Sequence, residues 1–353
     1  MKLLPNLNPK YLFSTAALPI LFLASVAPAA FAGGLKAGPH GIYALLPSYN
    51  SERPVELNRP VWSNPLVTGV TVRTVWKNVQ PVADKFDWSF FDEAVADAAR
   101  NGKHVGLSLA AGIFTPEWAY AAGMQRFDFT LTGPWIPTRA MTMPEPWDPV
   151  FLKTWGATLR AMGQRYDGNP AVAYITMGGV GFSIESFYVK TPEDIAKLQA
   201  MGGEKRWLEG AKRIVDLYAE AFPATPFIYA MAPPIKGDMS ATRALVEYGL
   251  AKYPGRFGMM HHGLNAQSMP GFYPDQAILK APNGTPAGFQ MVWSTVGPEG
   301  AQRVKGTLGQ ALERGVDFHA HFIEVYEDDC QNPACAGDLR TAGRRLTGGG
   351  GGE

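Results

Sequence analysis

Short apolar runs, rich in β-branched and aromatic residues, recur along the chain, and most are followed by a segment with apolar residues at helical spacing. Each run has the length of a β-strand, and the segments between them have the length of helices. Strands that alternate with helices predict a parallel sheet, and eight such strands predict a closed (β/α)8 TIM barrel of the α/β class. The runs span residues 41–47, 69–76, 104–112, 171–178, 226–232, 257–264, 288–295 and 317–326, and the predicted helices span residues 87–101, 147–166, 204–222, 240–253 and 300–314.

The predicted barrel forms one domain, residues 33–346, with two long loops. These loops follow the third and fourth strands and span residues 114–146 and 180–203. In (β/α)8 barrels the loops at the carboxyl ends of the strands build the binding site. We therefore expect a deep groove on that face of the barrel.

The N-terminal residues have the pattern of an export signal. Lys2 and Lys10 give a basic start, and an apolar stretch over residues 11–32 ends in Ala-Phe-Ala. A basic start, an apolar core and a small-residue exit are the parts of a secretory signal peptide. A membrane anchor is the alternative, but Pro19 and Pro28 interrupt the apolar stretch. The pattern therefore predicts a cleaved signal peptide over residues 1–32 and a secreted or periplasmic protein that no membrane holds after cleavage.

Charge and aromatic content narrow the class of partner. The chain has 32 basic and 31 acidic residues, a net charge of +1 and no basic stripe, so nucleic acid is not an expected partner. Aromatic residues make up 12% of the chain and include nine Trp, which favours a ligand with flat faces. No cofactor is expected.

The two cysteines lie close together near the C-terminal end. In an oxidising compartment, the short spacing between Cys330 and Cys335 predicts a local disulfide that closes a small loop. A metal site is less favoured, because two sulfurs with no nearby His are an incomplete ligand set. Residues 347–353 are almost all Gly and predict a flexible tail.

One stretch in the first half of the chain carries a more specific pattern. The second predicted strand, GVTVRTVW, contains Arg73 and ends in Trp76. It is followed by Val-Gln-Pro at 79–81, FDWSFFD at 86–92, GKHV at 102–105 and Pro-Glu-Trp at 116–118. This stretch resembles the N-terminal half of the (β/α)8 retaining glycoside hydrolases, particularly the β-galactosidase-like family 42. Two departures are that Arg73 and Trp76 lie one residue closer together than in that family, and that Gln80 replaces a Glu.

The resemblance implies a carbohydrate substrate and roles for several residues. It implies that Arg73 supports the catalytic pocket and that Trp76 and Trp118 lie near the substrate. Sugars present C–H faces that pack on aromatic rings, which agrees with this implication. The alternative for each Trp is a packing role. The resemblance also implies an acid/base Glu after the fourth strand and a nucleophilic Glu at the end of the seventh.

Two carboxylates are candidates for this chemistry. Glu185 follows the fourth strand, and its apolar and aromatic neighbours predict a raised pKa, as a general acid requires, although it could also be an ordinary solvated loop residue. The seventh strand has no carboxylate, and Gln290 stands about where the nucleophile is expected. Glu324, at the end of the eighth strand, is the strongest remaining candidate. Carboxylates from strands four and eight are expected to face each other across the barrel, which leaves retaining and inverting chemistry open.

Polar and aromatic residues at the carboxyl ends of the sixth and seventh strands are candidates for substrate binding. They offer hydrogen-bonding groups for sugar hydroxyls and an indole face for a sugar ring. These residues are His262, Asn265, Gln290 and Trp293.

Four histidines support a rival chemistry. His261 and His262 fall on the sixth predicted strand, and His319 and His321 fall on the eighth. An H-x-H pair on one strand points both imidazoles to the same face, so it could ligate a metal with Glu324. Glu324, however, is three residues past the second of them and points to the opposite face. Three hypotheses remain. The first is an exported glycoside hydrolase that cleaves a β-linked oligo- or polysaccharide by carboxylate acid/base catalysis. The others are a non-catalytic glycan-binding barrel and, less favoured, a metal-dependent hydrolase.

Overall fold

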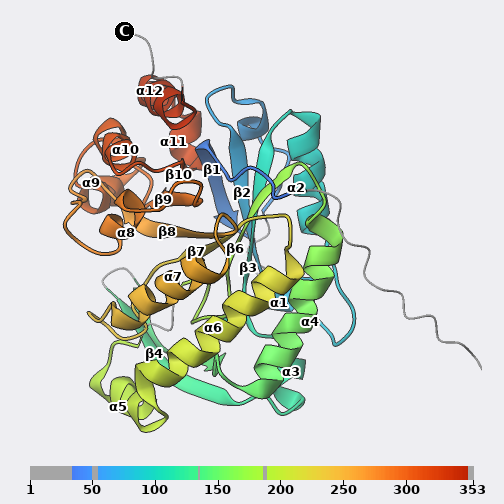
Figure 1. Cartoon of the computed structure of the whole chain (residues 1–353). Coiled ribbons are helices and arrows are strands. Elements are labelled where there is room, and N and C mark those ends of the chain that lie inside the picture. The colour runs from blue at the N-terminus through green and yellow to red at the C-terminus, as the bar shows by residue number, and fades with distance from the viewer. Residues whose placement is uncertain (1–33, 50–54, 134–135, 186–188, 349–353) are drawn as a thin grey trace, which may run out of the picture. The chain divides into compact units, whose positions relative to one another are not determined.

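Eight parallel strands close into a barrel in the order β1-β10-β9-β8-β7-β6-β3-β2, so the predicted (β/α)8 fold is confirmed (Figure 1). The computed structural model describes residues 34–49, 55–133, 136–185 and 189–348. The predicted signal peptide, residues 1–32, lies outside the described residues, as does most of the predicted tail. The barrel strands are β1 (Gly41–Ser48), β2 (Gly69–Val75), β3 (His104–Ala110), β6 (Val172–Thr176), β7 (Phe227–Ala230), β8 (Phe257–Leu264), β9 (Ala287–Met291) and β10 (Phe322–Tyr326).

The predicted helices form, with one difference. The segment predicted as a single helix over 300–314 is two helices, because Lys305 adopts a positive φ of 55° and Thr307 starts a new helix in a capping box with Gln310. The helices are α1 (Trp76–Val79), α2 (Ser89–Arg100), α3 (Glu117–Ala121), α4 (Pro149–Tyr166), α5 (Pro192–Ala200), α6 (Gly203–Ala221), α7 (Ser240–Lys252), α8 (Asp275–Leu279), α9 (Pro298–Val304), α10 (Leu308–Asp317), α11 (Glu327–Gln331) and α12 (Ala336–Leu346), with short 3-10 turns η1 (Pro60–Ser63), η2 (Gly112–Phe114) and η3 (Pro333–Cys335).

The last barrel strand is shorter than the sequence pattern predicts. Helix α10 continues to Asp317, and the chain then turns through His319, whose φ is 59°, before β10 begins at Phe322. The predicted strand over 317–326 is therefore wrong in its first half. His319 and His321 do not lie on a strand, and they precede the amino end of β10.

An antiparallel hairpin that the strand prediction missed lies in the long loop after β3. It consists of β4 (Arg126–Gly133) and β5 (Ile136–Pro144). Alternate β4 residues are buried, a pattern that is visible in the sequence RFDFTLTG. The hairpin is tied to α5 in the next long loop, because Asp194 accepts a hydrogen bond from Thr130 N at 2.8 Å.

The interior of the barrel is closed by three aromatic rings. Tyr43 packs edge-to-face on Tyr174, with ring centroids 5.4 Å apart, and both rings pack on Phe322. Glycines on the neighbouring strands make the space. A Cβ at Gly69 would lie 2.4 Å from the Tyr43 ring, and one at Gly106 would lie 2.3 Å from the Tyr174 ring. Larger residues at these two positions are therefore incompatible with the rings.

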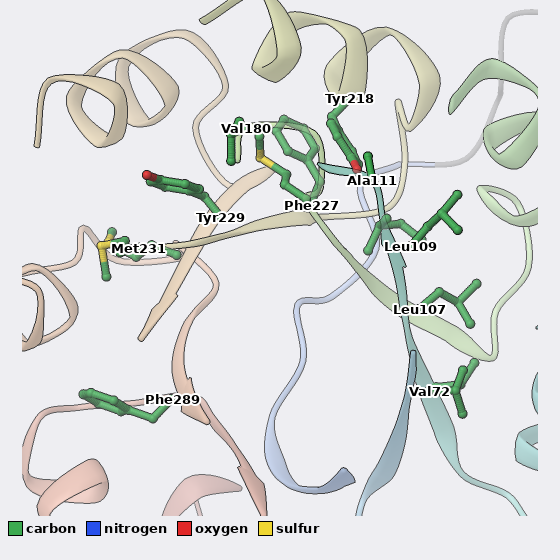
Figure 2. Packing of buried hydrophobic residues seen from close by; sticks show 14 of the residues in the cluster. Val72, Leu107, Leu109, Ala111, Val180, Tyr218, Phe227, Tyr229, Met231 and Phe289 are labelled. Carbon is green, nitrogen blue, oxygen red and sulfur yellow. The ribbon is translucent and has the colours of Figure 1, made fainter. Parts of the chain in front are cut away.

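The opposite faces of the strands form the layer between the barrel and the helices. Figure 2 shows part of it, with Val72 on β2, Leu107 and Leu109 on β3, and Phe227 on β7, all buried. This layer and the interior rings belong to separate apolar clusters, as the alternation of side chains along each strand requires. Among the described residues, no helix has both the length and the apolar character needed to cross a membrane.

Candidate active site

Glu324 points into the barrel from the middle of β10. Its side chain is almost fully buried, at 2% exposure. Its Oε1 accepts a hydrogen bond from the Tyr174 hydroxyl at 2.5 Å and another from the Thr71 hydroxyl at 3.0 Å. No described residue donates to Oε2. One oxygen thus anchors the carboxylate on β2 and β6, and the second is available to a ligand.

The position of Glu324 is one strand away from that of the expected nucleophile. Glu324 and Gln290 are Cα partners in the β9–β10 ladder, so they stand at the same level of the barrel. Neighbouring strands are about 4.8 Å apart. Glu324 therefore stands at the height of Gln290, on the adjacent strand.

Glu185 lies in the loop after β6 and is held by β7 and β8. Its backbone forms an isolated bridge with Ala230, the last residue of β7. Its Oε1 accepts a hydrogen bond from Nδ1 of His262 at 3.0 Å, and its side chain is 33% exposed. The loop carboxylate is therefore fixed by a side chain from β8 and still reaches solvent.

The pKa of Glu185 is lowered, so the prediction of a raised pKa is wrong. Burial raises the pKa, but the hydrogen bond and charge of His262, together with the charges of His261 and Lys190, outweigh burial and hold it below its usual value. The apolar sequence neighbours of Glu185 correctly indicate desolvation. They carry no information about the two histidines of β8 that supply the compensation.

The two carboxylates do not simply face each other from strands four and eight. Glu185 reaches sideways to His262 on β8, and Gln290 on β9 separates that strand from Glu324 on β10. Tyr326, at the end of β10, joins the two environments. Burial raises its pKa, Arg73 and Arg303 lower it, and the charges of both glutamates raise it further. Both carboxylates therefore lie close enough to Tyr326, at this mouth of the barrel, to influence its pKa.

Several buried polar atoms around this mouth lack partners. Nε2 of His262, Oε1 of Gln290 and Oγ of Ser108 are buried and have no hydrogen-bond partner among the described residues. Strand register places Ser108 beside Arg73 at the upper end of the barrel interior. Buried polar groups in folded proteins are nearly always hydrogen-bonded. An unpaired set beside two carboxylates is therefore suited to hydroxyl groups of a ligand.

Arg73 is a structural support at this mouth. Its Nε and Nη2 donate to the Leu46 carbonyl oxygen at 3.2 and 2.9 Å, which ties the end of β2 to β1. Its charge also lowers the pKa of Tyr326. Both observations agree with the supporting position that the family resemblance implies.

Trp76 packs inside an aromatic cluster, and its predicted place near the substrate stays a prediction. It is fully buried, lies 4.9 Å from the Trp155 ring, and donates to Oε1 of Gln80 at 2.9 Å. Trp118 donates to the backbone oxygen of Gln80 at 2.9 Å and packs edge-to-face on Trp76. The Gln80 side chain also accepts from Thr158 on α4. The Gln that replaces the family's Glu is thus an acceptor in this packing cluster.

The remaining predicted ligands differ in availability. Trp293, just after β9, is partly exposed, with its ring 5.7 Å from the Tyr326 ring and the Arg303 guanidinium 3.7 Å from its own centroid. It can present an aromatic edge to the mouth. Asn265 uses its amide in a local turn, donating to Gly263 O and accepting from Gln267 N, both at 2.9 Å. One N–H and one lone pair of the amide remain for a ligand, so its sugar-binding role stays a prediction.

The histidines do not assemble a metal site with Glu324. His321 lies near the start of β9, where its Nδ1 is 3.4 Å from Ala287 N, and His319 occupies the preceding turn. His261 pairs with Asp275 at 2.6 Å. Among the described residues, no group of three or more His, Cys, Asp or Glu side chains could hold a metal ion. The metal hypothesis depended on a strand that begins later than predicted, and its ligand set is corrected accordingly.

The predicted disulfide is also corrected, because Cys330 and Cys335 are both free and buried. Each sulfur has another neighbour. Sγ of Cys330 donates to Val325 O at 3.6 Å, and a hydrogen bond with Thr295 lowers the pKa of Cys335 against the larger raising effect of burial. Packing against the end of β10 therefore directs the two side chains to different partners.

Three residues of this site were not among the sequence candidates: Thr71, Tyr174 and Tyr326. Thr71 and Tyr326 follow from strand alternation once one interior residue of their strand is known. Thr71 and Arg73 have the same parity on β2, and Tyr326 has the parity of Glu324 on β10. The hydrogen bond between Tyr174 and Glu324 joins residues 150 positions apart and needs the closed barrel to be visible.

Comparison with known proteins supports the resemblance. A glycoside hydrolase 42 family model, described as beta-galactosidase, matches residues 66–184, which contain the motifs given above. Over that stretch the chain is similar to this family. The match ends one residue before Glu185 and includes none of β7 to β10. No curated protein matches the chain.

Solved structures share the fold at low sequence identity. A β-galactosidase from the psychrophilic Marinomonas ef1 is 11% identical, with a TM-score of 0.51 over 86% of this chain and 59% of that one. The catalytic domain of a β-amylase from Paenibacillus polymyxa is 11% identical, with a TM-score of 0.52 over 88% of this chain and 97% of that one. A β-galactosidase from Bacillus circulans sp. alkalophilus is 11% identical, with a TM-score of 0.53 over 88% and 56%. The chain thus spans less than two thirds of either β-galactosidase.

Proposed function

We propose that this chain is a glycoside hydrolase in which Glu185 and Glu324 are the two catalytic carboxyl groups. The observation that carries the proposal is the register of β9 and β10, which sets Glu324 beside Gln290 at the level of the missing nucleophile. The family match over residues 66–184 supports the reaction class. Glycoside hydrolysis needs one carboxyl group to protonate the leaving oxygen and a second to attack the sugar or activate water.

The environments of the two glutamates divide these roles. Glu324 is held through Oε1 by two hydroxyl donors, which suits the carboxylate that attacks the anomeric carbon directly or through water. Glu185 is the acid/base. It is ionised in the free protein, so a proton must join it as substrate binds. A sugar that covers its exposed third removes water from the carboxylate, which raises the pKa and favours protonation.

The proposed substrate is a carbohydrate, with a β-galactoside as the first probe. The choice follows the description of the family that matches residues 66–184. The unpaired polar atoms of His262, Gln290 and Ser108 supply both donors and acceptors for sugar hydroxyls. Trp293 and Tyr326 supply aromatic surface beside them.

The test measures hydrolysis of 4-nitrophenyl β-D-galactoside, β-D-glucoside and β-D-xyloside by the purified full chain. Glu185→Gln and Glu324→Gln are each expected to lower kcat/KM for the best substrate by about 10³-fold. Glu209→Gln, an exposed glutamate on α6, is the matched control and is expected to retain full activity. Full activity in either carboxylate variant would remove that residue from the proposal. The anomeric form of the first product separates retention from inversion.

A non-catalytic glycan-binding barrel is the second candidate. Two observations favour it: the 2% exposure of Glu324 and the Gln at position 290 of β9. Binding of a glycan by the wild-type chain, with no turnover of any of the three probes or of oligosaccharides, would replace the catalytic proposal with this one.

We also propose that the protein is exported to a secreted or periplasmic location. The basic and apolar pattern of residues 1–32 supports this. Fractionation of cells that express the full chain, with mass spectrometry of the product, tests it. A mature protein that begins at Gly33 outside the cytoplasm is expected. An uncleaved chain in the cytoplasm would contradict the proposal.

A further inference from the structure

A polar groove of about 550 Å³ lies on the same side of the barrel as the two carboxylates. Its walls come from the segment between β1 and β2, the loop after β9, and α11 with the residue that follows it. Strand ends and following loops form the carboxyl face of a barrel, where substrates bind. The lining residues are Asn58, Arg59, Pro60, Val296, Glu327, Asp328, Gln331 and Asn332.

The groove has a fixed frame. Nε of Arg59 donates to both oxygens of Glu327 at 2.9 Å, and Gln331 donates to the same carboxylate at 2.6 Å. Behind this pair, the buried Asp329 accepts hydrogen bonds from the backbone N and the hydroxyl of Thr295. These bonds fasten the loop after β9 to α11. The walls therefore keep their shape without a ligand, which lowers the entropic cost of binding.

The groups that remain free suit an uncharged, hydroxyl-rich ligand. Arg59 and Glu327 neutralise each other, so the exposed carboxylate of Asp328 is the charged group of the lining that no ion pair compensates among the described residues. Asn58 and Asp328 are exposed, and no described residue hydrogen-bonds to either side chain. Val296, 46% exposed, adds an apolar surface. Amide and carboxylate groups around an apolar patch are the pattern that a sugar needs, with hydroxyls at its rim and C–H groups on its face.

Residues that line the groove are close in sequence to residues of the candidate active site. Glu327 directly follows Tyr326, on whose pKa both Glu185 and Glu324 act. Trp293 packs beside Tyr326 and precedes Val296 by three residues. The packed pair of Trp293 and Tyr326 is thus joined by short chain segments to two walls of the groove.

We propose that this groove is a second sugar-binding segment of the active-site cleft, so that the substrate is an oligo- or polysaccharide of neutral sugars rather than a single glycoside. The inference rests on the proposed function for the identity of the ligand as a glycan. It further proposes that the substrate has several sugar units and that the groove side chains bind the additional units. A volume of this size lies within the range that small-molecule sites occupy in proteins, about 300–1,000 Å³.

Calorimetric titration of the full-length Glu324→Gln variant, which should bind without turnover, tests the proposal. The probes are β-1,4-linked galacto- and gluco-oligosaccharides of two to five units. Affinity is expected to rise with chain length for one series. Adding Asn58→Ala or Asp328→Ala is expected to weaken binding of the longest oligomer by about 3- to 10-fold, with a smaller effect on the disaccharide. Asn283→Ala, an exposed asparagine in the loop before β9, is the matched control and should change neither.

Affinity that does not depend on length, binding of no oligomer in either series, or equal affinity in the groove variants would each overturn the proposal. The outcome is separable from that of the proposed function. Length-dependent binding in a protein that hydrolyses nothing would retain the groove and remove catalysis. Hydrolysis of short glycosides with no dependence on length would retain catalysis and remove the groove.

Discussion

The two glutamates of the candidate site occupy opposite kinds of environment. Glu185 belongs to a loop, is one third exposed, and is stabilised as a carboxylate by His262. Glu324 belongs to a strand inside the barrel, is 2% exposed, and is anchored by the hydroxyls of Thr71 and Tyr174. A loop carboxylate can change its solvation when a ligand arrives, whereas a strand carboxylate keeps its position. This difference is the reason why the proposed function gives proton transfer to the first and attack to the second.

Substrates with different leaving groups separate the roles of the two glutamates most clearly. The largest expected effects, on kcat/KM, belong to this test. Glu324→Gln should lower kcat/KM by about 10³-fold or more for every aryl glycoside, because no substrate replaces the attacking carboxylate. Glu185→Gln should lower it by about 10² to 10⁴-fold for 4-nitrophenyl glycosides. The kcat/KM of the same variant should fall much less on 2,4-dinitrophenyl glycosides, because their leaving groups need no protonation. Steady-state kinetics on the two substrate types measures the contrast.

If the two variants respond alike to the leaving group, the division of roles is wrong. If Glu324→Gln is the leaving-group-sensitive variant, the roles are reversed. Circular dichroism spectra that match the wild type are needed for both variants, since Glu324 is bonded inside the barrel.

A second test compares the two tyrosines beneath Glu324. Tyr174 donates to the carboxylate at 2.5 Å, whereas the Tyr43 hydroxyl is buried with no partner among the described residues. Hydrogen bonds to charged groups contribute about 1.5–3 kcal/mol. Tyr174→Phe is therefore expected to lower the unfolding free energy by this amount and to reduce kcat. Tyr43→Phe removes an unpaired hydroxyl and should leave the unfolding free energy unchanged or slightly higher.

Urea unfolding of both variants at pH 7 measures the difference, and activity is assayed on the same samples. Similar losses of stability in the two variants would mean that the hydroxyl of Tyr174 contributes no more than general packing. In that case Glu324 would not be anchored through Oε1, and its role as a fixed carboxylate would lose its structural basis.

The third test addresses the loop carboxylate through pH. His262→Ala removes the largest contribution that lowers the pKa of Glu185 and leaves the burial that raises it, so the pKa must rise. An acid is active in its protonated form, so kcat/KM falls as pH rises through the pKa of the free enzyme. In His262→Ala this fall is expected at higher pH than in the wild type. His262→Asn retains an N–H donor, so it should shift the pH at which kcat/KM falls by a smaller amount.

The same substitution changes acid stability in a defined direction. A carboxyl group whose pKa is lowered on folding stabilises the protein above its unfolded pKa, near 4.5, and loses this contribution as pH falls through the folded pKa. His262→Ala should therefore lose less stability than the wild type between neutral pH and the acid range. If the fall of kcat/KM in His262→Ala occurs at the wild-type pH or at lower pH, His262 does not set the protonation of Glu185.

The barrel could be predicted from the sequence because its signals are local. Eight short apolar runs and the helical spacing between them are each contained within about ten to twenty residues. Two errors were also locally visible. The start of α10 carries a capping box at Thr307 and Gln310, and the missed β4 strand alternates in RFDFTLTG. Both signals are short and compete with the longer patterns around them.

The chemistry of the site was less predictable, because it depends on side chains that meet only in the fold. Glu324 could be named from its place at the end of an apolar run. The sign of the Glu185 pKa shift depends on His262, which lies 77 residues away. The burial of Trp76 depends on α4 packing over the turn that follows β2. Local sequence indicates which groups are desolvated, and tertiary contacts decide what compensates them.

The smallest expected effect concerns Gln290, which stands between the two environments. Its Oε1 is buried without a partner among the described residues, so it contributes no hydrogen bond to the fold. Replacing it by the similarly sized Met should leave the unfolding free energy unchanged or raise it by up to about 1 kcal/mol. KM should rise by about 3- to 10-fold if a sugar hydroxyl donates to this oxygen. A clear loss of unfolding free energy with unchanged KM would mean that the Gln290 amide stabilises the barrel. In that case β9 would support Glu324 and would not bind the substrate through Gln290.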